Sequence, residues 1–123
     1  MAYMTDRKRA VGRGSAKTGT DHAWSMKKTS VALLLLIPFF IFTFGGALGG
    51  TYEDILAYYS RPWPALVAAL TLLVGFHHFN MGVQVLIEDY VHGLAAKIAI
   101  LLMTCLSYGA AAVGIFAIAK LAL

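Results

Sequence analysis

Cysteine and charge are both scarce in this chain of 123 residues. Cys105 is the only cysteine, so no internal disulfide can form and no cluster of thiolate metal ligands can be built. Charged residues make up 13% of the sequence and hydrophobic residues 59%, with a mean hydropathy of +0.72. So few charges cannot cover a soluble core of that apolarity. The composition therefore excludes an ordinary soluble domain and favours a membrane protein.

Motifs for cofactors and nucleic acids are also missing. The sequence has no glycine-rich dinucleotide fingerprint, so it cannot hold a flavin by the usual motif. Nothing beyond a basic N-terminal tail resembles a nucleic-acid-binding module, and we expect no nucleic-acid partner. The chain shows no internal repeat and has no room for a second globular domain.

Three long apolar runs dominate the rest of the sequence, at about 29–50, 63–87 and 95–123. Each is near the roughly 20 residues that a helix needs to cross the hydrocarbon of a bilayer. Backbone groups in lipid must be satisfied within the segment, so we expect an all-α integral membrane protein with three transmembrane helices. Pro38 should kink the first of them. Residues 1–28 are expected to form a polar, basic segment with an interfacial helix that begins at Thr20 or Asp21.

Basic residues are concentrated ahead of the first apolar run. Seven of the ten Lys and Arg residues lie there: Arg7, Lys8, Arg9, Arg13, Lys17, Lys27 and Lys28. This asymmetry predicts a cytoplasmic N-terminus; of the three crossings, the first two return the chain to the same side at Asp89, Tyr90 and His92, and the third places Leu123 on the opposite side. A secretory signal peptide has a similar basic flank, but we expect this segment to be retained, which favours a bacterial inner membrane over a mitochondrial one.

The second apolar run contains ionisable residues, which are costly at bilayer depth and therefore mark candidate functional sites. It carries His77 and His78 in its interior and ends in Asp89 and Tyr90. Eleven residues separate His78 from Asp89, which is three helical turns plus about 20°, so both lie on one face roughly 16 Å apart. That face combines a possible metal ligand with a possible proton-handling group.

Glycines flank one of the two histidines. Gly75 and Gly82 lie at i−3 and i+4 from His78, leaving a flat recess that suits the edge of a haem. His77 is rotated by about 100° and cannot reach the same iron. A histidine in a membrane helix is also often a hydrogen-bonded packing residue. Because His22 and His92 lie near the membrane rim, a second axial histidine would have to come from a partner chain.

Asp89 and Tyr90 allow two interpretations from the residues alone. A tyrosine hydroxyl can donate a hydrogen bond to a quinone carbonyl, and a nearby carboxylate can relay protons. Alternatively, both residues are ordinary polar side chains at the end of a membrane helix, and the tyrosine serves as an interfacial anchor.

Two stretches of the sequence resemble the small D-type membrane-anchor subunit of succinate dehydrogenase, respiratory complex II. The first runs from His78 through Gly82 to Asp89-Tyr90-Val91. The second is the entry into the first apolar run: Gly14-Ser15-Ala16-Lys17, Gly19-Thr20-Asp21-His22-Ala23-Trp24 and Lys27-Lys28-Thr29. Together with the three apolar runs, the resemblance covers essentially the whole chain.

The resemblance implies roles for four residues. His78 matches the axial ligand of haem b, whose other ligand comes from the companion C-type anchor subunit. Tyr90 matches the tyrosine that hydrogen-bonds ubiquinone, and Asp89 matches its acidic neighbour. Lys27 falls where the family usually has an arginine near the haem propionates and the quinone pocket; lysine keeps the charge but loses the two-pronged geometry. The doublet of His77 and His78 is a further departure from the family pattern.

The resemblance also implies the function. The chain would anchor a flavoprotein subunit with FAD and an iron–sulfur subunit to the membrane, and would complete a ubiquinone-reduction site without a catalytic residue of its own for succinate oxidation. An anchor of a quinol-oxidising fumarate reductase is an alternative, because the residues do not indicate the direction of electron flow. A non-redox membrane adaptor with structural histidines is the alternative from a different class.

Overall fold

The computed structural model describes residues 5–12 and 20–123, and the resemblance at Gly14–Lys17 and Gly19 therefore lies outside the described residues. Five helices follow one another: α1 (Asp6–Val11), α2 (Asp21–Ala47), α3 (Tyr52–Tyr59), α4 (Pro62–Tyr90) and α5 (Gly93–Ala122). The long helices α2, α4 and α5 have 27, 29 and 30 residues and are apolar enough to cross a membrane. The prediction of an all-α protein with three transmembrane helices is confirmed for the described part of the chain.

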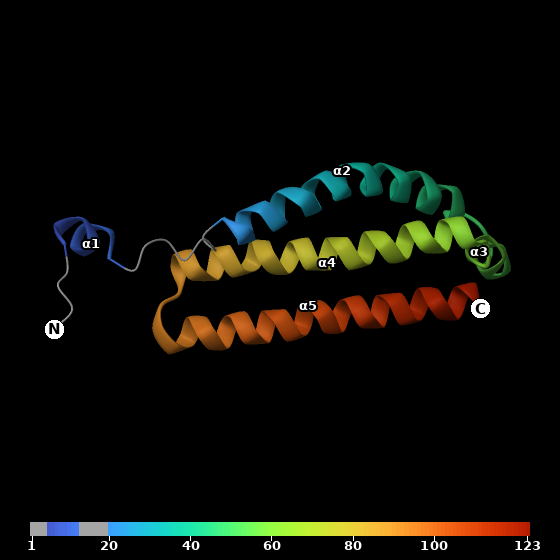
Figure 1. The fold of residues 1–123 in the computed structure, drawn as a ribbon. Coiled ribbons are helices and arrows are strands. Elements are labelled where there is room, and N and C mark those ends of the chain that lie inside the picture. Colours follow the sequence, from blue (N-terminus) through green and yellow to red (C-terminus); the bar gives the residue numbers. More distant parts are fainter. Residues whose placement is uncertain (1–4, 13–19) are drawn as a thin grey trace.

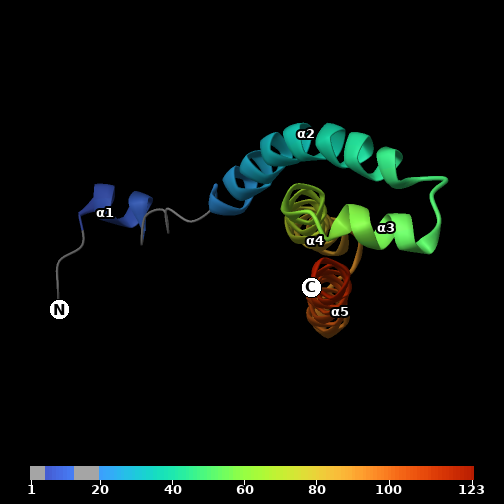
Figure 2. The same ribbon diagram turned by 90° about the vertical axis from the view of Figure 1, so that its right-hand side faces the viewer.

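The three long helices form an open row. Helix α4 packs against α2 on one side and α5 on the other, whereas no contact joins α2 to α5 within the described residues (Figures 1 and 2). Such a row buries little apolar surface, and large side chains such as Leu34, Phe42 and Phe116 remain exposed. Exposed apolar area of this extent requires lipid or partner helices to cover it.

Helix α2 is continuous from the polar tail into the apolar run. It begins at Asp21, so His22, Trp24 and Lys27 belong to the same helix as the membrane-spanning residues that follow. Its ribbon arches along its length (Figure 1), and Pro38 lies inside it. Proline removes one backbone donor and crowds the preceding turn, which bends a helix.

Two short helices, α1 and α3, were not predicted from the sequence. Helix α1 begins after Thr5, whose side chain accepts a hydrogen bond from the Lys8 backbone N–H. Helix α3 begins with a capping box: the Thr51 N–H donates to Asp54 Oδ2 at 2.9 Å, and the Asp54 N–H donates to Thr51 Oγ1 at 3.3 Å. The side-chain and backbone hydrogen bonds from Thr51 lower the pKa of the Asp54 carboxyl, which keeps it ionised.

Small side chains bring α4 and α5 close together. Ser107 and Ala111 are buried between the helices, and a Cβ added to Gly114 would lie only 2.8 Å from Leu72 Cδ1. The Thr104 hydroxyl also donates to Asn80 Oδ1 at 3.2 Å across the interface. Close backbone approach and a side-chain hydrogen bond are the usual means by which helices associate in a membrane.

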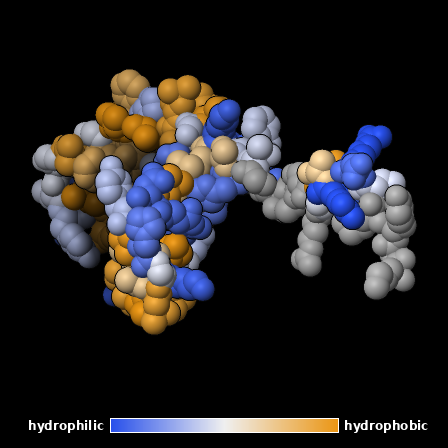
Figure 3. All heavy atoms as spheres, turned by 90° about the vertical axis from the view of Figure 1, so that its left-hand side faces the viewer, coloured by the Kyte–Doolittle hydropathy of each residue, from blue (hydrophilic) through white to orange (hydrophobic). Residues whose placement is uncertain are grey.

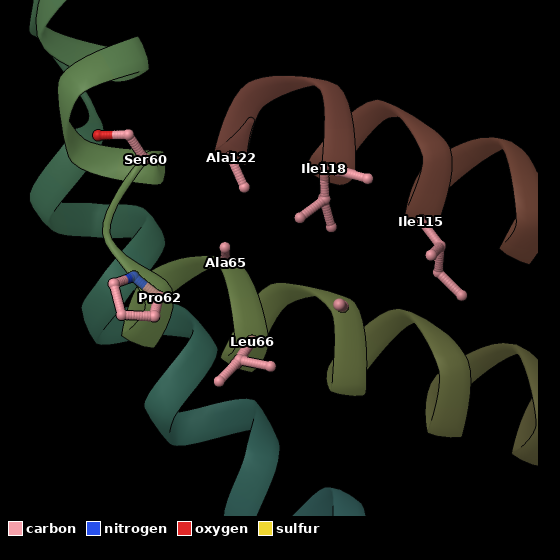
Figure 4. Close-up of a pocket in the computed structure, with 9 residues that line it drawn as sticks. Ser60, Pro62, Ala65, Leu66, Ile115, Ile118 and Ala122 are labelled. Carbon is pink, nitrogen blue, oxygen red and sulfur yellow. The ribbon is translucent and has the colours of Figure 1, made fainter.

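An apolar cavity of about 380 Å³ separates α4 and α5 beyond this contact (Figure 4). It lies near the start of α4 and the end of α5, and it is lined by residues such as Pro62, Ala65, Ile115 and Ile118. Tyr90 is at the other end of α4, so this cavity is separate from the candidate site.

Candidate functional site at the centre and polar end of α4

His78 faces α2. Its Nδ1 atom lies 2.8 Å from the hydroxyl oxygen of Thr29, and the ring is half-buried between the two helices. The Thr29 hydroxyl also lies 3.0 Å from the Ser25 carbonyl oxygen and 2.9 Å from the Met26 carbonyl oxygen. A hydroxyl has one proton, and here it is within reach of two backbone carbonyls of its own helix.

These contacts are all satisfied by one assignment of protons. In the tautomer that carries the proton on His78 Nδ1, the Thr29 hydroxyl donates to a backbone carbonyl and its oxygen accepts a hydrogen bond from the His78 Nδ1–H. The other ring nitrogen, Nε2, then carries a lone pair, and no hydrogen bond joins it to another residue in the described part of the chain. A ligating histidine typically donates its second ring N–H in this way, which fixes the tautomer and the ring orientation. In this tautomer the Nε2 atom would be free to act as a ligand.

The glycines on either side of His78 leave space beside it. A Cβ added at Gly75 or at Gly82 would meet no heavy atom within 4 Å, outside the helix's own backbone and sequence neighbours. Both positions lie one turn from His78, above and below it on α4. A planar group can approach the helix there more closely than it could over any larger side chain.

His77 faces the opposite neighbour. Its Nδ1 atom lies 3.0 Å from the Tyr108 hydroxyl of α5, and the two rings are tilted against each other with centroids 6.3 Å apart. The two adjacent histidines thus contact different helices, as expected from a rotation of about 100° per residue. His77 thus pairs with Tyr108 of α5, whereas His78 pairs with Thr29 of α2 and lies between Gly75 and Gly82.

Asp89 and Tyr90 form the last turn of α4. The Val91 N–H still bonds the Ile87 carbonyl at 2.8 Å, but the backbone of Val91 is extended, and the helix ends there. Both side chains are exposed, and 78% of the surface of Tyr90 is accessible. Viewed from this end of the bundle, a hydrophilic area lies beside apolar side chains (Figure 3). Both residues are open to a ligand or a partner chain.

Lys27 lies on a different side of α2 from the contact with α4. It is exposed, and it borders a surface hollow of about 280 Å³ together with Trp24, Lys28 and Val31. Thr29 points toward α4, and Lys27 precedes it by two residues, or about 200° of rotation. The structure therefore does not bring Lys27 together with His78.

His22, which lies near the membrane rim, is a further candidate for the site on the side of α2 that faces α4. Its Nε2 atom is buried and has no hydrogen-bond partner among the described residues. His22 precedes Thr29 by seven residues, nearly two full turns, so it lies on the side of α2 that faces α4. The seven-residue spacing between His22 and Thr29 is the feature of the sequence that indicates a shared side of the helix.

The described residues contain no group of three or more His, Cys, Asp and Glu side chains that could hold a metal ion. His78 would therefore supply a single ligand, and a second axial ligand would have to come from another chain or molecule.

Comparison with known proteins identifies the family of the chain. Residues 1–118 match the family described as Succinate dehydrogenase/Fumarate reductase transmembrane subunit. The chain belongs to this family. It is 41% identical over 123 residues to the succinate dehydrogenase hydrophobic membrane anchor subunit of Paracoccus denitrificans, covering 100% of this chain and 95% of that protein. The match extends over both the α2 entry and the histidine-bearing helix α4.

More distant family members match a shorter part of the chain. The succinate dehydrogenase hydrophobic membrane anchor subunit of Rickettsia bellii is 27% identical over 84 residues, covering 68% of this chain and 66% of that protein. The protein of the same name from Rickettsia conorii is 28% identical over 87 residues. No solved structure matches the chain. Membership of this family, with three apolar helices, makes the chain a multi-pass membrane-anchor subunit of succinate dehydrogenase.

Proposed function

We propose that this anchor subunit provides one axial ligand of a haem b through His78 and completes a ubiquinone-reduction site with Asp89 and Tyr90. The observation that carries the proposal is the 2.8 Å contact between His78 Nδ1 and the Thr29 hydroxyl, which leaves Nε2 available as a ligand. The relative from Paracoccus denitrificans is named as a succinate dehydrogenase anchor, which supports this setting.

The residues around His78 fit a haem. His78 supplies the nitrogen ligand, Thr29 orients the imidazole, and Gly75 and Gly82 leave room for a planar macrocycle. The buried Nε2 atom of His22 lacks a partner among the described residues, and a propionate or a polar group of another subunit would satisfy it. Lys27 is exposed beside α2, and we propose that it pairs with a propionate or a quinone-site group on that side. A bound haem of this kind supplies a one-electron redox centre within the membrane.

The exposed end of α4 suits quinone chemistry. Reducing a quinone to a quinol takes two electrons and two protons. The Tyr90 hydroxyl would donate a hydrogen bond to one quinone carbonyl, and Asp89 would pass protons to the same site from the aqueous side. Both side chains are exposed in the isolated chain, so the partner subunits would form the remaining walls of the pocket.

The proposed partners are the subunits that would carry the flavin, the iron–sulfur clusters and the second haem ligand. We propose a flavoprotein subunit that carries FAD, an iron–sulfur subunit, and a C-type cytochrome b anchor that provides the second haem ligand. These partners would cover much of the apolar surface that α2 and α5 expose. We place the N-terminus in the cytoplasm, because seven of the ten basic residues precede Thr29. We also propose a bacterial inner membrane as the location of the complex, which the relative from Paracoccus denitrificans fits.

A second candidate is the anchor of a quinol:fumarate reductase, because the family description includes fumarate reductases. Measuring both directions in membranes that contain the complex separates the two functions. We expect succinate-driven reduction of a ubiquinone analogue to exceed quinol-driven reduction of fumarate. A faster fumarate reduction with a low-potential quinol would assign the chain to the second function.

Replacing Thr29 by valine tests the support for His78. Valine keeps the shape but removes the acceptor for His78 Nδ1–H. We expect the haem to be held about 10–100-fold more weakly, and its midpoint potential to rise because the ligand becomes less basic. A redox titration of the haem absorption in the purified complex measures both effects.

Ser30→Ala is the matched control for Thr29→Val. Ser30 is the next residue of α2, is exposed, and donates to the Met26 carbonyl of its own helix at 2.9 Å. The control should titrate like the unaltered complex. Equal behaviour of Thr29→Val and the unaltered complex would show that this hydroxyl does not support a ligand.

A further inference from the structure

A second pocket lies at the end of the bundle opposite Tyr90. Here the last turn of α2, the following loop and α3 enclose about 250 Å³ (Figure 2 views this end). Its walls are Gly46, Ala47, Gly50, Asp54, Ala57, Tyr58 and Arg61. Because α2 ends and α4 begins here, the pocket lies at the level where the apolar spans meet water.

The polar groups of this pocket have opposite charges. Asp54 contributes a carboxylate that its hydrogen bonds to Thr51 keep ionised, and Arg61 contributes a guanidinium. No ion pair joins the two within the described part of the chain, although both border the same pocket. Tyr58 adds a hydroxyl whose oxygen would lie 3.6 Å from a Cβ placed on Gly46. A ligand with an anionic and a cationic group would satisfy both charges.

We propose that this pocket binds the headgroup of a zwitterionic phospholipid with a primary amine, phosphatidylethanolamine. Arg61 and the Tyr58 hydroxyl hold the phosphate, and Asp54 holds the ammonium. The acyl chains lie along the exposed apolar faces of the bundle, where Phe42 and Leu66 are accessible.

The size and position of the pocket favour a headgroup over a quinone. Pockets for drug-sized ligands usually enclose about 300–1,000 Å³ and are mostly apolar, whereas this pocket is smaller and borders two charges. The aromatic side chains of α3, Tyr52, Tyr58 and Tyr59, are the type enriched at the membrane interface, where headgroups lie. The pocket thus presents its charges at headgroup depth.

Lipid retention by the purified complex tests the proposal. The complex is exchanged into nanodiscs that contain either phosphatidylethanolamine or phosphatidylglycerol, then released into detergent and examined by native mass spectrometry. We expect the unaltered complex to retain one phosphatidylethanolamine at this chain, with less retention of phosphatidylglycerol, which lacks the amine. Arg61→Gln should lower the retention about tenfold, because a charge-assisted contact with the phosphate is lost.

Two further variants make the test specific. Asp54→Asn keeps the shape and the acceptor for Thr51 but loses the charge, so the preference for the amine headgroup should disappear. Lys120 is a cation in the last turn of α5 at the same end and does not line the pocket, so Lys120→Gln should retain lipid like the unaltered complex.

Several outcomes would overturn the proposal. The first is that Arg61→Gln retains as much lipid as the unaltered complex. The second is that Lys120→Gln loses as much lipid as Arg61→Gln. The third is that the complex shows no preference between the two lipids. Complete displacement of the bound species by inorganic phosphate would assign the pocket to a free anion in place of a lipid.

Discussion

Replacing His78 by alanine is expected to abolish the low-spin haem spectrum of the complex. His78 has an imidazole oriented by Thr29 and open space at Gly75 and Gly82 on the two neighbouring turns. Loss of one axial ligand leaves the iron five-coordinate or prevents haem retention altogether. Absorption spectra of the oxidised and reduced complex, normalised to the flavin content, measure the change.

His77→Ala is the matched control for His78→Ala. It removes an imidazole from the adjacent position, but it breaks the 3.0 Å contact with Tyr108 on α5 and leaves the contact between His78 and Thr29 in place. The low-spin signal should therefore remain, with at most a modest loss of stability from the missing interhelical hydrogen bond. If His77→Ala loses the haem and His78→Ala keeps it, the choice of ligand is wrong. If both variants keep the haem, this chain does not ligate it.

Replacing Tyr90 by phenylalanine is expected to slow electron flow from succinate to ubiquinone by about five- to 150-fold. The change keeps the ring and deletes the hydroxyl donor, and a polar partner left unpaired in a desolvated pocket typically costs about 1–3 kcal/mol. Membranes containing the variant are assayed with a ubiquinone analogue.

Succinate oxidation with an artificial acceptor separates quinone binding from assembly in the Tyr90→Phe variant. The acceptor takes electrons upstream, at the flavin or the iron–sulfur clusters, so this activity should stay near normal. Parallel loss of both activities would mean that Tyr90 maintains the assembly. If the variant reduces quinone at the normal rate, the hydrogen-bond donor is Asp89 or a residue of a partner subunit and not Tyr90.

The three membrane helices could be predicted because their signal is contained in the chain itself. Apolar runs of sufficient length allow no other backbone structure in lipid, and this applies equally to α2, α4 and α5. Helix α3 was harder to predict because eight residues give little periodicity, and its start depends on the reciprocal bonds between Thr51 and Asp54. Helix α1, with six residues and one cap at Thr5, has an even weaker signal.

The candidate site could be predicted only in part, because partners across helices depend on tertiary register. The spacing of Gly75, His78 and Gly82 is a property of one helix and can be read from the sequence. The bond from His78 to Thr29 joins residues 49 positions apart, and only the packing of α2 against α4 brings them together. The roles of His78, Asp89, Tyr90 and Lys27 stay predictions.

The direct test of the account is the reduced-minus-oxidised absorption spectrum of the purified complex, combined with low-temperature electron paramagnetic resonance of the oxidised haem. If His78 and a histidine of the companion anchor bind one iron, the spectrum shows a b-type haem, and the resonance is that of a low-spin ferric iron with two imidazole ligands, at one haem per flavin. A complex that contains this chain and oxidises succinate, but shows no haem absorption, would contradict the account.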